Sequence, residues 1–132
     1  MAEVTGLAHV GIYVDDIERS KKFYKDILGL ECIEETAFEM DGNGFHCAFV
    51  QRGSVCLELI HRRIGSNPGD GMTDHVAYAV DDLEAIIEKL KEKGIEFESE
   101  EPKYCDTMFP NGTKWIFFRG PDQEHIELAQ VL

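Results

Sequence analysis

The sequence HVGIYVDDIE at residues 9–18 recurs as HVAYAVDDLE at residues 75–84, and six of the ten positions are identical. Each half of the chain also closes on a similar stretch, LEL at residues 57–59 and IEL at residues 126–128. Self-similarity at a nearly fixed offset is the signature of a repeated structural unit. We therefore interpret the chain as two copies of one module of about 60 residues.

Each copy carries the signals of one strand, one helix and three further strands. Residues 7–14 are apolar and β-branched, which predicts the first strand. Asp15 with Glu18 resembles a capping box, as does Asp81 with Glu84, so each helix is expected to begin there. The remaining strands are expected at about 30–39, 44–52, 55–61, 95–101, 113–119 and 124–131.

These elements predict an α+β fold with the βαβββ order twice. The first module takes residues 1–61 and the second takes residues 73–132. Between them, residues 62–72 read RRIGSNPGDGM, and this density of glycine and proline is typical of a linker. The modules are too small to be separate domains, so we expect one domain overall.

The composition excludes several classes of partner. The chain has 132 residues, 43% of them hydrophobic, and a formal net charge of −13. This acidic excess argues against nucleic acid and anionic membranes, because both select for lysine and arginine. No apolar run is long enough to span a bilayer, and the N-terminus does not read as a secretory signal. The four cysteines form no CxxC pair, so we expect reduced thiols and a cytoplasmic location.

Strand alternation gives each module one histidine and one glutamate on the same kind of face. Successive side chains of a strand point to opposite sides of the sheet. His9 in the first strand and Glu58 in the last strand both alternate with apolar residues, and His75 and Glu127 repeat the pattern. The apolar faces are expected to pack on the helices. The histidines and glutamates should then lie together on the opposite, concave face.

The recurrence of these four residues predicts a metal site. A single histidine or glutamate of this kind is most often an ordinary surface residue. Its repetition at equivalent positions favours a ligand, because a partly buried carboxylate needs a partner that a divalent metal would supply. The predicted ligands are His9, Glu58, His75 and Glu127. Two imidazoles and two carboxylates suit Ni²⁺, Co²⁺, Zn²⁺, Fe²⁺ or Mn²⁺, and the sequence leaves the metal open.

Four stretches resemble the vicinal oxygen chelate superfamily, the fold of glyoxalases and bleomycin-resistance proteins. They are LAHVGIYVDDIERSKKFYKDILGL, VCLELI, TDHVAYAVDDLE and KWIFFRGPDQEHIEL, and the resemblance extends from Leu7 to Gln130. It implies that the eight strands form a cleft-like mixed sheet around a metal site, with the helices outside. It also implies that the first and last strands of each module supply the ligands, which are the same four residues.

The ligand set is similar to that of bacterial glyoxalase I, a lactoylglutathione lyase. This likeness implies a lyase or isomerase that moves a proton α to a carbonyl and converts a hemithioacetal to a thioester. The metal would be the Lewis acid, and Glu127, with Glu58 as second choice, would be the base. Asp26 stands where such enzymes commonly carry an arginine for glutathione. Racemisation of an acyl-CoA, as in methylmalonyl-CoA epimerases, therefore stays open, as does a non-catalytic small-molecule-binding resistance protein.

The sequence gives weaker signals for the substrate. Arg62, Arg63 and Lys114 are candidates for an anionic tail, and Phe49 and Trp115 are candidates for a pocket wall, although such residues are more often surface or core. The expected partner is a small molecule, such as a thiol adduct or an acyl-CoA. The resemblance also implies a homodimer with two metal sites. Whether the modules pair within one chain or between two stays open.

Overall fold

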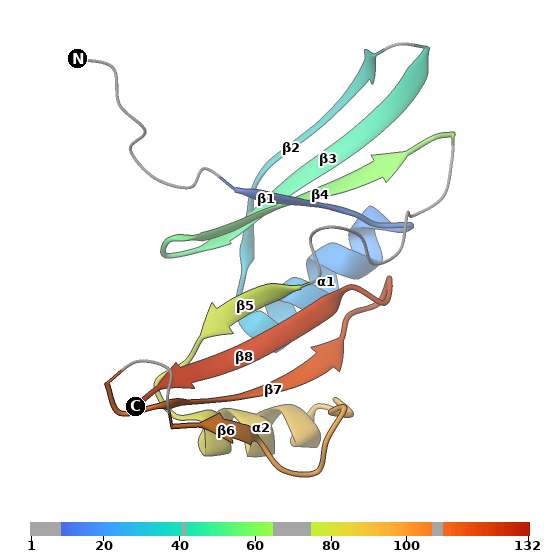
Figure 1. Ribbon diagram of the computed structural model, residues 1–132. Helices are drawn as coiled ribbons and strands as arrows, with labels where there is room; N and C mark the ends of the chain where they lie inside the picture. Colours follow the sequence, from blue (N-terminus) through green and yellow to red (C-terminus); the bar gives the residue numbers. More distant parts are fainter. Residues whose placement is uncertain (1–8, 41, 65–74, 107–109) are drawn as a thin grey trace, which may run out of the picture. The chain divides into compact units, whose positions relative to one another are not determined.

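The computed structural model describes residues 9–40, 42–64, 75–106 and 110–132 (Figure 1). The chain forms two compact units, Met1–Asn67 and Pro68–Leu132. Each unit has the βαβββ order of elements, so the predicted α+β class is confirmed. The division between the units falls inside the segment predicted as a linker, and residues 65–72 of that segment lie outside the described residues.

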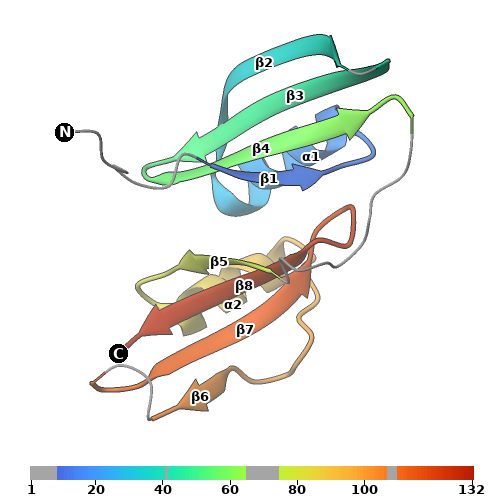
Figure 2. The same cartoon turned by 45° about the horizontal axis from the view of Figure 1, so that its top comes forward.

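In the first unit, the first strand pairs with the last strand of the same unit. Its elements are β1 (Val10–Tyr13), α1 (Ile17–Leu28), β2 (Glu31–Met40), β3 (Asn43–Arg52) and β4 (Val55–Arg62). The strand order is β1-β4-β3-β2, as Figure 2 shows. The strand β1 runs parallel to β4, whereas β4, β3 and β2 are antiparallel neighbours.

The second unit repeats this topology. Its elements are β5 (Val76–Ala79), α2 (Leu83–Glu92), β6 (Lys103–Cys105), β7 (Thr113–Arg119) and β8 (His125–Val131). The order is β5-β8-β7-β6, with β5 parallel to β8. The described residues thus form two four-stranded mixed sheets, one in each unit. The closure of both sheets around one metal site remains a prediction.

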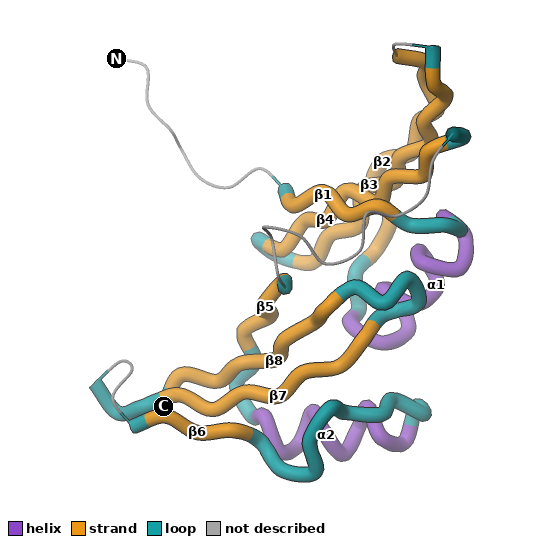
Figure 3. The backbone as a smooth tube through the Cα atoms, turned by 45° about the vertical axis from the view of Figure 1, so that its right-hand side comes forward, coloured by secondary structure: helices purple, strands orange, loops and turns teal. Residues whose placement is uncertain are grey.

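The core of each unit lies between its helix and one face of its sheet (Figure 3). In the first unit α1 contacts β3 and β4, and Tyr24 and Leu59 are among the fully buried side chains. In the second unit α2 contacts β8, and Leu90 and Leu128 are buried in the same way. Burial of each leucine side chain of this kind stabilises the folded unit by about 1.5–3 kcal/mol. No helix in the described ranges is long and apolar enough to cross a membrane.

Each helix begins at the second aspartate of its Asp-Asp pair, and the predicted capping boxes at the first aspartate are wrong. The Asp16 side chain accepts a hydrogen bond from the N–H of Arg19 at 3.0 Å, and Asp82 accepts one from Ala85 at 3.0 Å. The glutamate of each pattern therefore lies two residues after the cap, which is too early to bond back to it. It still lies in the first turn, where a negative charge favours the helix.

Residues 95–101 do not form the predicted strand. The edge strand that pairs with β7 is β6, which lies later in the chain than the predicted strand. Phe97 makes an isolated bridge to Phe118, and the N–H of Glu98 donates to the carbonyl of Phe117 at 2.9 Å. The Glu98 carboxylate also accepts a hydrogen bond from Arg119 of β7 and lies beside His125 of β8. Backbone and side-chain contacts therefore both hold this acidic segment against the second sheet.

Candidate metal centre

The parallel pairing of β1 and β4 brings His9 to Glu58. Gly11 lies opposite Glu58 in the register, and His9 precedes it on the same face. The His9 Nε2 atom lies 3.3 Å from Glu58 Oε1. A Cβ atom on Gly11 would lie 3.2 Å from Ile60 Cδ1 and 3.7 Å from Glu58 Oε1, so the missing side chain keeps this corner open. The Glu58 side chain is 21% exposed and can be reached from this face.

The second unit builds the same pair from β5 and β8. Ala77 lies opposite Glu127, and His75 Nε2 lies 2.8 Å from Glu127 Oε2. The Glu127 side chain is 15% exposed. The structure therefore brings the four predicted ligands together as two pairs, one in each unit, at equivalent register positions.

A phenylalanine borders each histidine–glutamate pair, and we call each pair with its phenylalanine a half-site, because its two donors are half of the predicted ligand set. Phe49 of β3 lies opposite Glu58, and its ring meets the His9 ring edge to face at 5.2 Å. Phe117 of β7 lies opposite Glu127 and meets the His75 ring at 5.4 Å in the same way. Phe49 was a predicted site residue, and Phe117, which the sequence also offers as a pocket residue, occupies the same place in the second module.

Cys47 lies beside Glu58 in the first half-site. It is 2% exposed and lies on the same face of β3 as Phe49. Burial, together with the charge of Glu58 and a hydrogen bond to its carboxylate, raises the pKa of the Cys47 thiol to about 11. The thiol is therefore protonated at neutral pH and serves as a donor to Glu58 rather than as a thiolate ligand.

His125 lies beside the second half-site, although the sequence alone favours a surface or core role for a histidine of this kind. Its Nε2 lies 3.2 Å from Glu98 Oε2. Its ring stacks on Phe117 with the centroids 4.4 Å apart. Glu98 lies in the segment 95–101, which was predicted to be a strand. This prediction did not include a contact between Glu98 and His125.

The candidate substrate residues lie in different places. Arg62 shares a face with Glu58 and covers the Tyr13 ring, with Cζ 4.4 Å from the ring centroid. Trp115 shares a face with Phe117 on β7.

Two other candidates lie away from the paired ligands. Arg63 follows β4 and bonds Glu39 through Nη1 at 3.2 Å. Lys114 points to the helix side of its sheet, where Nζ lies 2.7 Å from both carboxylate oxygens of Glu84 in α2. The hydrogen bond from Lys114 lowers the pKa of Glu84. The structure therefore brings neither cation to a histidine–glutamate pair.

The spacing of each histidine–glutamate pair fits two ligands of one ion. Ligand atoms about 2.1 Å from a divalent metal at ordinary coordination angles lie about 3 Å apart. The observed separations of 3.3 and 2.8 Å agree with this spacing. Within the described ranges no group of three or more histidines, cysteines, aspartates or glutamates is placed to hold a metal. Each pair thus supplies two donors, and the four-ligand set remains a prediction.

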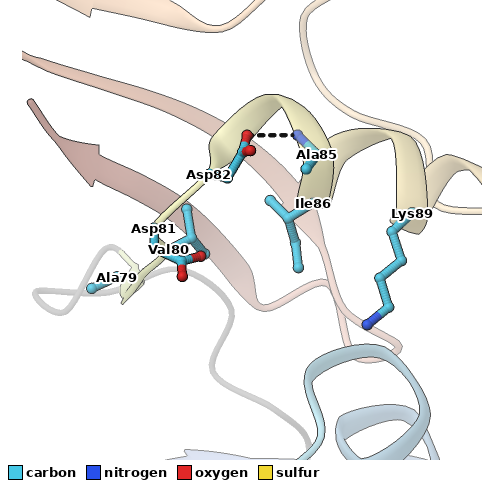
Figure 4. Close-up of a pocket in the computed structure, with 7 residues that line it drawn as sticks. All are labelled: Ala79, Val80, Asp81, Asp82, Ala85, Ile86 and Lys89. Carbon is cyan, nitrogen blue, oxygen red and sulfur yellow. Dashed lines mark hydrogen bonds between the residues drawn. The ribbon is translucent and has the colours of Figure 1, made fainter.

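A pocket of about 620 Å³ lies elsewhere, at the start of α2 (Figure 4). Its walls include Val80, Ile86 and Lys89, beside the Asp82 cap that bonds Ala85. None of the predicted site residues lines it. The pocket therefore does not belong to the candidate metal centre.

Comparison with known proteins places the chain in a family. The model of the Glyoxalase/Bleomycin resistance protein/Dioxygenase superfamily matches residues 6–128. Human mitochondrial methylmalonyl-CoA epimerase is 34% identical over 105 residues, which cover 74% of this chain and 58% of the epimerase. A probable lactoylglutathione lyase from Synechocystis sp. is 31% identical over 133 residues and covers 95% of both chains. A glyoxalase family protein from Enterococcus faecalis has a crystal structure similar to this one, with a TM-score of 0.73, 27% identity, and coverage of 95% and 97% of the two chains. The chain belongs to the Glyoxalase/Bleomycin resistance protein/Dioxygenase superfamily.

Proposed function

We propose that this protein is a divalent-metal-dependent enzyme that moves a proton at a carbon next to a thioester carbonyl, with an acyl-CoA as its substrate. The observation that carries the proposal is the histidine–glutamate pair at the same register position of both units. Members of the superfamily bind a divalent metal such as manganese. Here His9, Glu58, His75 and Glu127 would hold the ion, and a bound metal would polarise the carbonyl and acidify the neighbouring C–H bond.

A carboxylate would carry the proton transfer. Glu127 is the first choice as base that takes the α-proton onto a carboxylate oxygen. The protonated Glu127 can then return a proton to the same carbon, and Glu58 is the second choice for this role. Phe117 and Phe49 contact the two histidine rings edge to face, which places apolar surface beside the reacting groups.

The acyl-CoA is favoured over a glutathione adduct by two observations. The first is the similarity to methylmalonyl-CoA epimerase. The second is Asp26, which stands in place of the expected glutathione-binding arginine and forms an ion pair with Lys22 on α1. A lactoylglutathione lyase reaction is the second candidate, since that relative matches over nearly the whole of both chains. A homodimer and a small-molecule substrate are part of the proposal.

The proposal can be tested with methylmalonyl-CoA in D₂O after loading with Mn²⁺, Co²⁺, Ni²⁺ or Zn²⁺. Mass spectrometry would show deuterium at the α-carbon, and absorbance would follow a hemithioacetal of methylglyoxal and glutathione in parallel. Glu127→Gln should slow the active reaction by roughly 10²–10⁴-fold, the usual contribution of a general base. Glu88→Gln is the matched control, because Glu88 is an exposed α2 residue paired with Lys91.

The two assays separate the candidates. Exchange in the acyl-CoA alone supports the proposed substrate, and turnover of the hemithioacetal alone supports the lyase. A metal-loaded protein that is inactive towards both would overturn the enzyme proposal and favour a non-catalytic binder.

A further inference from the structure

We propose that His125 is a positioning residue that fixes the orientation of His75 through Phe117. The inference rests on the proposed metal site and adds to it a residue that would not touch the metal or the substrate. It is carried by a continuous series of contacts from Arg119 through Glu98, His125 and Phe117 to His75.

The outer end of this series is anchored by charge. Arg119 Nε donates to Glu98 Oε1 at 3.1 Å, and the other oxygen of Glu98 lies 3.2 Å from His125 Nε2. The His125 side chain is only 12% exposed. Because Glu98 holds one side of the imidazole and the surrounding unit encloses the rest, the ring has a fixed plane.

The inner end consists of aromatic contacts. The His125 ring stacks on Phe117 with an interplanar angle of 29° and a centroid distance of 4.4 Å. The Phe117 ring meets His75 at 80°, and the His125 ring also meets His75 at 80° with centroids 6.1 Å apart. Two rings of fixed orientation thus restrict His75, whose Nε2 lies 2.8 Å from Glu127. Packing that restricts the rotamer of a site residue holds its ring in one geometry.

The first unit supplies an internal comparison. Cys56 precedes Glu58 by two residues, as His125 precedes Glu127. Phe49 makes the same edge contact with His9 that Phe117 makes with His75, but a cysteine offers no ring to stack on it. The series of contacts is therefore a feature of the second half-site, and a cysteine at the equivalent place provides the matched control.

The first arm of the test uses the full-length, metal-free protein. Nuclear Overhauser contacts between the His75 and Phe117 rings, and the His75 ring chemical shifts, would be compared in wild type, His125→Ala, His125→Phe and Cys56→Ala. We expect His125→Ala to weaken the contacts and shift the His75 signals, His125→Phe to retain most of them, and Cys56→Ala to leave them unchanged. Unchanged His75 signals in folded His125→Ala would overturn the inference.

The second arm measures the affinity for Mn²⁺ and Zn²⁺ by competition with a chelator. We expect roughly 2–10-fold weaker binding in His125→Ala, the fold-change that corresponds to one lost aromatic pair, and a smaller loss in His125→Phe. Glu98→Ala removes the anchor at a partly exposed position and should give an intermediate loss without unfolding. Equal affinity of His125→Ala and wild type would contradict the inference.

These outcomes are separate from those of the proposed function. A wild-type protein that binds metal but turns over no substrate would refute the enzyme proposal and leave the positioning role to be decided by affinity. If the wild type bound no metal, the proposed function would fail and the ring contacts of the first arm would decide alone whether His125 positions His75.

Discussion

Tyr78 is buried on the helix side of β5, and its hydroxyl has no hydrogen-bond partner in the described part of the chain. A buried hydroxyl without a partner costs about 1–3 kcal/mol. We therefore expect Tyr78→Phe to stabilise the protein at pH 7 by about 1 kcal/mol, measured by urea unfolding. Tyr104→Phe is the control, because Tyr104 is exposed and should change nothing. A less stable Tyr78→Phe variant would contradict this reading of the site.

The same residue predicts a pH dependence. Burial, and the charge of Glu124, raise the pKa of Tyr78 far above its usual range. The unfolded chain releases the phenol proton near pH 10 while the folded chain retains it. The free energy of unfolding is therefore unaffected by this proton below about pH 10 and declines as the pH rises further. Unfolding at pH 7 and pH 10.5 should show a smaller decline in Tyr78→Phe than in wild type. Parallel declines would exclude Tyr78 as the source.

The thiols of Cys47 and Cys32 should differ greatly in reactivity. Cys32 is exposed, whereas Cys47 is buried and its pKa is raised to about 11. At pH 8 only about 0.1% of a thiol with that pKa is ionised, and the thiolate is the reactive form. An aromatic disulfide reagent should therefore show a fast phase that Cys32→Ser removes and Cys47→Ala leaves intact. A fast phase lost in Cys47→Ala would show that this thiol is accessible.

Single residues were predictable from sequence where the repeat gave them a counterpart. His9 and Glu58 could be matched to His75 and Glu127, and the structure confirms that each pair is in contact. Lys114 could not be placed, because its side of β7 follows from the register of β7 on β8. The contacts of His125 could not be predicted, because its partner, Glu98, is distant in sequence and lies outside any strand.

At the scale of elements, the helix caps give a sharp test. Asp16 and Asp82 are the N-cap residues, and their side chains accept the hydrogen bonds that begin the helices. Asp16→Ala and Asp82→Ala should each cost about 1 kcal/mol of unfolding free energy. Asp15→Ala and Asp81→Ala are the matched controls and should cost clearly less. If the control variants lost more unfolding free energy than the cap variants, the result would support the capping boxes predicted from the sequence.

Most elements could be predicted because their patterns are local. The seven residues of β7 match the predicted strand at 113–119, since apolar alternation fixes both its ends. The strand β6 has three residues and no such pattern. Its position depends on where β7 leaves an edge free for pairing, which no local signal encodes.

At the scale of the whole molecule, the two half-sites predict the metal stoichiometry. Each unit supplies two donors, so a four-ligand ion requires two units and the chain should bind one ion, measured by elemental analysis. His9→Ala and His75→Ala should each lose nearly all of the bound metal, because they remove ligands of the same kind of site. Retention of about half of the metal in either variant would indicate two independent sites.

A mixture of these two variants would show which chain supplies each pair. If the site takes its pairs from two chains, mixed dimers of His9→Ala and His75→Ala contain one intact site, and metal binding returns. If both pairs come from one chain, the mixture stays empty. The homodimer itself is tested by light scattering, and the cytoplasmic location stays a prediction.

The pairing of β1 with β4, and of β5 with β8, also has a consequence for folding. His9 and Glu58 are 49 residues apart in sequence, and His75 and Glu127 are 52 apart, yet each pair is in contact. Contacts between distant residues require closure of a long loop, and they form late on average. A histidine–glutamate pair therefore forms only after the first and last strands of its module have paired. An incomplete or misfolded module presents isolated histidines and carboxylates, so metal capture by this chain should report the completion of each module.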